Sequence, residues 1–62
     1  MHPLEQTIQQ IQNEYLNGNI SREERDYMLA QIRDIQVAQE CAGNEQMFRY
    51  LVQACNIAMA IA

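Results

Sequence analysis

The 62-residue sequence contains no tryptophan and no lysine, and it has only one histidine, one proline, two glycines and two cysteines. Histidine and cysteine are the usual ligands of zinc and the usual groups around a catalytic nucleophile. A chain so poor in both is expected to hold no metal, no cofactor and no catalytic constellation. Two cysteines are also too few for the disulfide framework of a small secreted domain. We therefore expect Cys41 and Cys55 to be reduced, buried and apolar in character.

Basic side chains are scarce as well. Four arginines stand against eight carboxylates, which gives a net charge of −4. Proteins that hold the phosphate backbone of nucleic acid normally present a basic stripe, and this composition argues against one. Nine glutamines and five asparagines supply most of the remaining polar surface. Amides create no long-range field, so recognition is expected to be short-range and to depend on shape.

Targeting and membrane signals are not expected. The segment MHPLEQ has no basic region followed by an apolar core, so we expect no signal peptide. We therefore expect a cytoplasmic location. The longest uncharged segment is residues 50–62, YLVQACNIAMAIA. A membrane span needs about 20 apolar residues. This segment is too short, and we expect it to be buried against protein.

A first helix is predicted over residues 3–17. Pro3 suits the first helical position, where its missing N–H would have no partner. Gly18 stands where a left-handed C-terminal cap is needed. The apolar side chains recur at spacings of four, three and four, which places them on one helical stripe: Leu4, Ile8, Ile11 and Tyr15.

A second helix is predicted over residues 22–42. Ser21 and Glu24 have the spacing of a capping box, in which each side chain binds the other residue's backbone N–H. Arg22 and Asp26 are four apart and are expected to pair. The predicted core stripe of this helix is Met28, Leu29, Ile32 and Ile35, and it fades into Val37, Ala38 and Ala42.

A third helix is predicted over residues 45–62, with Asn44 as its cap and Glu45 paired with Arg49. Ile57 and Ile61 lie outside its main stripes, so the apolar surface wraps most of the helix. Such a helix is expected at the centre of a bundle. Because a chain this short buries only about 60% of its surface, we expect a second chain to help cover it. The candidate interface residues are Met47, Phe48, Leu51, Val52, Cys55 and Met59.

Residues 15–32 resemble a helical hairpin of small bacterial and phage proteins, the SHOCT-type short C-terminal domain. The resemblance rests on Gly18, Ile20, Ser21, Glu23, Glu24 and Leu29. It covers under a third of the chain, and much of it is cap chemistry. It implies a hairpin with a protein-interaction role and carries over no functional residue. The length and general character of this sequence also resemble those of the small accessory proteins of temperate phages.

These observations predict an all-α, three-helix mini-bundle in one domain, completed by homo-oligomerisation. The leading functional hypothesis is a small non-enzymatic interaction protein that regulates a process by binding another protein. One alternative is a DNA-associated helix-turn-helix regulator whose Arg22, Arg25 and Arg33 meet phosphate or base edges. In that case Glu23, Glu24 and Asp26 would crowd the same end and repel DNA. Another alternative is a structural component of an assembly.

Overall fold

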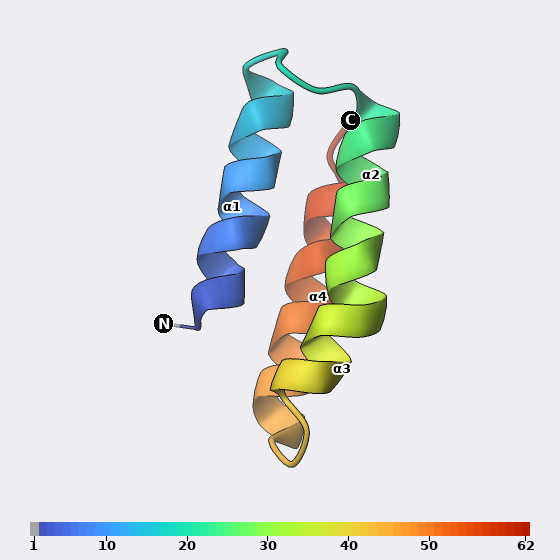
Figure 1. The fold of residues 1–62 in the computed structure, drawn as a ribbon. Helices are drawn as coiled ribbons and strands as arrows, with labels where there is room; N and C mark the ends of the chain where they lie inside the picture. The colour runs from blue at the N-terminus through green and yellow to red at the C-terminus, as the bar shows by residue number, and fades with distance from the viewer. Residues whose placement is uncertain (1) are drawn as a thin grey trace.

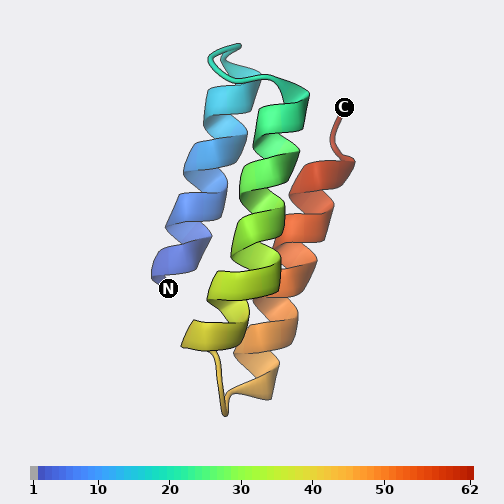
Figure 2. The ribbon, with the colours of Figure 1, turned by 45° about the vertical axis from the view of Figure 1, so that its right-hand side comes forward.

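The computed structural model describes residues 2–62, which form a bundle of three helical rods that run up, down and up (Figures 1 and 2). The elements are α1 (Pro3–Leu16), α2 (Arg22–Gln31), the π-helical turn η1 (Ile32–Gln36), α3 (Val37–Glu40) and α4 (Glu45–Ala60). The second rod is continuous through α2, η1 and α3. The predicted all-α, three-helix mini-bundle is confirmed, and the helix boundaries differ from the predicted ones by at most two residues.

The predicted helix starts are present. The Ser21 hydroxyl oxygen accepts from the Glu24 backbone N–H at 3.1 Å, and a Glu24 carboxylate oxygen accepts from the Ser21 N–H at 2.8 Å. These bonds hold the pKa of Glu24 below its usual range, the bond from the Ser21 backbone being the larger cause. Asn44 Oδ1 likewise accepts from the Met47 N–H at 3.1 Å. The predicted capping box and the predicted Asn44 cap are therefore confirmed.

The end of α1 is a complete Schellman motif. Gly18 has φ +78°, in the left-handed region that favours glycine. Its N–H donates to the Tyr15 carbonyl at 3.0 Å, and the Asn19 N–H donates to the Glu14 carbonyl at 2.9 Å. The two bonds satisfy carbonyls that the helix leaves free at its end. This confirms the predicted role of Gly18.

One apolar core joins all three rods. Both cysteines lie in it and are free thiols, as expected. Burial raises the pKa of the Cys55 thiol. The core consists of Leu4, Ile8, Leu29, Ile32, Val37, Cys41, Leu51, Cys55 and Ala58. Because the bundle is about 36 Å long and only 16 to 19 Å thick, each helix keeps a face outside this core.

The predicted stripe of the second rod is half wrong. Leu29 and Ile32 are buried, whereas Met28 and Ile35 are 40% and 48% exposed. The exposure of Ile35 is caused by η1, where the Val37 N–H donates to the Ile32 carbonyl five residues back. This wide turn holds one more residue than an α-helical turn and rotates the helix after it. Val37, rather than Ile35, therefore follows Ile32 into the core.

Candidate functional site

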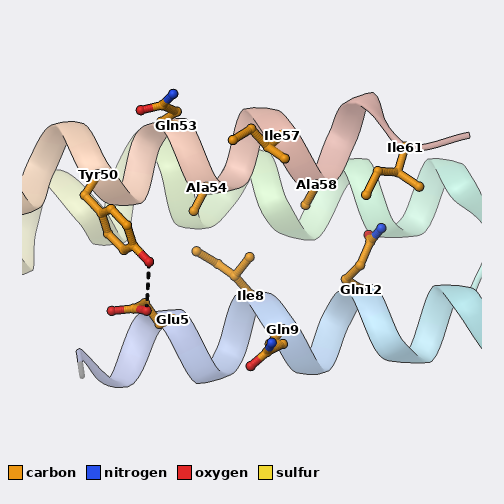
Figure 3. A pocket seen from close by; sticks show the side chains of 10 residues that line it. All are labelled: Glu5, Ile8, Gln9, Gln12, Tyr50, Gln53, Ala54, Ile57, Ala58 and Ile61. Carbon is orange, nitrogen blue, oxygen red and sulfur yellow. Dashed lines mark hydrogen bonds between the residues drawn. The ribbon is translucent and has the colours of Figure 1, made fainter.

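An apolar groove of about 570 Å³ runs between α1 and α4, and we call it the α1–α4 groove (Figure 3). On the α1 side its lining consists of Glu5, Ile8, Gln9 and Gln12. On the α4 side it consists of Tyr50, Gln53, Ala54, Ile57, Ala58 and Ile61. Most of this lining is apolar or carries an amide. Among the lining residues described, Glu5 carries the one charge.

The groove exists because α4 places small residues where it faces α1. Ala54 and Ala58 lie one helical turn apart and leave room that larger side chains would fill. Ile8 points from α1 toward α4 at their level (Figure 3). Ile57 and Ile61 stand beside the alanines and are 58% and 44% exposed. Ile8 thus fills the space beside the two alanines, while the side chains of Ile57 and Ile61 remain uncovered.

Gln12 brings an unpaired amide to this groove. Its side chain extends from α1 toward α4 (Figure 3). The amide oxygen and nitrogen are both buried, and neither has a hydrogen-bond partner among residues 2–62. Leaving a buried polar group unpaired costs about 1–3 kcal/mol. This amide therefore marks a place where the single chain leaves a hydrogen-bonding requirement unmet.

A hydrogen bond closes one end of the groove. The Tyr50 hydroxyl of α4 donates to a Glu5 carboxylate oxygen of α1 at 3.1 Å (Figure 3). This bond, together with the negative charge of Glu5, raises the pKa of Tyr50. The hydrogen bond joins the start of α1 to α4, and it engages the Glu5 carboxylate, the charged group of the lining.

A second polar centre lies where α4 ends beside the start of α2. Arg25 is completely buried, and its guanidinium donates to the carbonyl of Ile61 at 2.6 Å and to that of Met59 at 3.1 Å. The guanidinium also stacks on the Tyr15 ring, 4.2 Å from the centroid, and pairs with Asp26 at 3.0 Å. One side chain therefore joins all three rods and satisfies the carbonyls at the end of α4.

This arrangement corrects two predictions. Asp26 pairs with Arg25, not with Arg22, because the Arg25 side chain turns inward and meets its neighbour's carboxylate. Arg25 also cannot reach phosphate or base edges, as the DNA-binding alternative required, because none of it is exposed. Arg33 is occupied on the surface by Asp34 at 2.8 Å and by Asn56 at 2.9 Å.

The predicted interface residues fall into two groups. Leu51 and Cys55 are completely buried in the chain's own core, so a partner cannot reach them in this fold. Their assignment to an interface is corrected to that extent, because the single chain already covers them. Met47, Val52 and Met59 pack partly against the same core, and Phe48 is 38% exposed. For these four the interface role stays a prediction.

The surface ion pair predicted at the start of α4 is present, with Arg49 and Glu45 joined at 2.8 Å. Both side chains are more than three-quarters exposed, so this pair contributes little to stability. Within residues 2–62 no cluster of three metal-ligating side chains occurs. None of the helices described has the length and apolar character to cross a membrane.

No family model, curated protein or solved structure matches this chain. The resemblance of residues 15–32 to SHOCT-type hairpins stays a prediction. The α1–α4 groove and the Arg25 centre are consequently interpreted from their own geometry.

Proposed function

We propose that this protein is a small non-enzymatic helical interaction protein, and that it binds another protein through the α1–α4 groove. The observation that carries the proposal is that Ile57 and Ile61, two large aliphatic side chains, line this groove and remain uncovered. An apolar surface gains free energy when a partner covers it.

The shape of the groove favours a helix as the binding element. Two rods with small residues between them form a trough into which an amphipathic helix can pack with a stripe at i, i+3, i+4 and i+7. A helix placed there would convert three rods into a four-helix arrangement, in which each helix is packed on two sides.

The charge distribution favours an uncharged contact surface on the partner. Residues 50–62 carry no charge, and the Glu5 carboxylate already accepts from Tyr50. Binding should then depend on burial and shape, and it should weaken only slightly as salt is raised.

The test is capture of partner proteins by the purified chain from extracts of the cells that express it. Ile57→Glu places a charge on the rim of the groove at a side chain that is 58% exposed. Tyr27→Glu is the matched control, because Tyr27 is 68% exposed on α2 and does not line the groove. Both variants should keep the helical circular dichroism of the wild type.

We expect Ile57→Glu to lose the captured protein and Tyr27→Glu to retain it. Equal capture by all three chains would show that the groove is not the binding surface. Equal loss in both variants would also contradict the proposal, since it would point to a general charge effect.

A further inference from the structure

We propose that the α1–α4 groove faces the same groove of a second copy of this chain, with α4 opposite α4 and α1 opposite α1. The two α4 helices then run antiparallel about a two-fold axis. In this arrangement Ala54 faces Ile61 of the second copy, and Ile57 faces Ala58 of the second copy. This inference rests on the proposed function of the groove as a protein-binding surface, and it identifies the bound protein as a second copy of the same chain.

The order of large and small residues along α4 makes this face complementary to its own copy. Ala54, Ile57, Ala58 and Ile61 all line the groove and lie on one helical stripe. When the stripe is reversed end to end, each alanine position falls on an isoleucine position. Every protruding side chain of one copy therefore meets a hollow of the other. A two-fold interface requires such self-complementarity, because the same patch is used twice.

The charge distribution along the chain also permits self-association through this face. Each chain carries −4, which would normally oppose self-association. Yet the segment that would face its copy, residues 50–62, has no charged side chain. The antiparallel arrangement also places the positive end of one helix dipole beside the negative end of the other. It sends the two Glu5 residues to opposite ends of the interface.

The area of the face is consistent with a weak but specific dimer. With 16 residues α4 is about 24 Å long. Two adjacent helices, each about 10 Å wide, present a face of about 500 Å² per chain. That is near the lower end of specific interfaces, which corresponds to dissociation constants in the micromolar range.

The first experiment is sedimentation equilibrium of the full chain across concentrations from about 1 μM to about 1 mM. The wild type should change from monomer to dimer within this range. Ile57→Glu should weaken the dimer at least about 100-fold, because each interface would then bury two unpaired carboxylates. Tyr27→Glu should leave the dimer unchanged. A wild type that stays monomeric throughout, or a dimer that Ile57→Glu leaves intact, would overturn the inference.

The second experiment tests the register by disulfide formation. When Ala54→Cys and Ile61→Cys chains are mixed and oxidised, the two new thiols should cross-link efficiently as a heterodimer. Each variant alone should cross-link poorly, because residues 54 of the two copies would be about 10 Å apart along the axis, beyond the reach of a disulfide. Preferential linking within one variant would refute this register.

The two experiments separate this inference from the proposed function. A monomeric chain that still loses a captured protein through Ile57→Glu would overturn the homodimer and keep the groove as a binding surface. A dimer with the predicted cross-link and no other captured protein would support the homodimer and restrict the groove to self-association.

Discussion

Replacing Arg25 should be the most damaging single change to a charged residue of this protein. In the native fold its guanidinium donates to the carbonyls of Met59 and Ile61 and stacks on the Tyr15 ring. Hydrogen bonds that involve a charged group contribute about 1.5–3 kcal/mol each, and a desolvated cation–π contact contributes about 2 kcal/mol. Removing one partner from a buried charged network costs about 3–5 kcal/mol.

We expect Arg25→Ala to lower the free energy of unfolding by about 3 kcal/mol, at the lower end of that range. The reason is that both carbonyls lie at the end of α4 and can bind water once the guanidinium has gone. A 62-residue domain has a total stability of about 3–9 kcal/mol, so this loss is a large fraction of it. The free energy of unfolding of Arg25→Lys should lie between those of the wild type and Arg25→Ala. Lysine keeps the positive charge, but its ammonium group cannot make the same planar pair of hydrogen bonds as the guanidinium.

Urea unfolding followed by far-ultraviolet circular dichroism measures the effect, since the chain has no tryptophan to report it. Arg22→Ala is the matched control, because Arg22 lies on the same helix and is exposed, and it should change stability by about 0.5 kcal/mol or less. If the two alanine variants differ by less than about 1 kcal/mol, the network around Arg25 does not hold the bundle together as argued.

Four further outcomes are expected. Gln12→Leu should raise the free energy of unfolding by about 1 kcal/mol in dilute monomer, by removing the unpaired amide, and calorimetry would contradict this if stability fell. Gly18→Ala should cost about 1–2 kcal/mol in urea unfolding through its φ of +78° alone, because nothing lies within 4 Å of the added Cβ. The pKa of Glu24 is lowered in the folded state, so its contribution is present above the ordinary value of 4.5 and is lost as pH falls through the folded pKa. An acid titration of stability should accordingly show Glu24→Gln less stable than wild type near neutral pH and equal to it in strong acid. The Cys55 thiol, buried and with a raised pKa, should react with a thiol reagent only as fast as the bundle opens; rapid labelling of native protein would contradict its placement.

The helix ends could be predicted from the sequence because each one depends on residues three to five positions apart. The Ser21 and Glu24 capping box, the Asn44 cap and the Gly18 terminus are all of this kind. The Glu45–Arg49 pair belongs with them, at four residues' separation. Such features follow from local backbone geometry, so a linear pattern contains all the information that they need.

The candidate site could not be predicted in the same way. Arg25 contacts carbonyls 34 and 36 residues away, and Tyr50 contacts Glu5 across 45 residues. A linear pattern shows that Ile57 and Ile61 are apolar, but which side of α4 faces α1 depends on how the rods pack. One signal for Arg25 was present: it precedes Leu29 by four residues and Ile32 by seven, and so continues their buried stripe.

The single π-helical turn also bears on how the length of this chain can vary. Buried positions 29 and 32 are followed by 37, whereas an unbroken heptad pattern would continue at 36. The second rod is thus equivalent to a regular α-helix into which one residue has been inserted, with η1 absorbing the extra residue as a local bulge. A chain shortened by one residue within η1 would keep the same apolar face as an uninterrupted helix. The number of residues between the Ser21 cap and the turn before α4 can therefore differ by one while the second rod buries the same face.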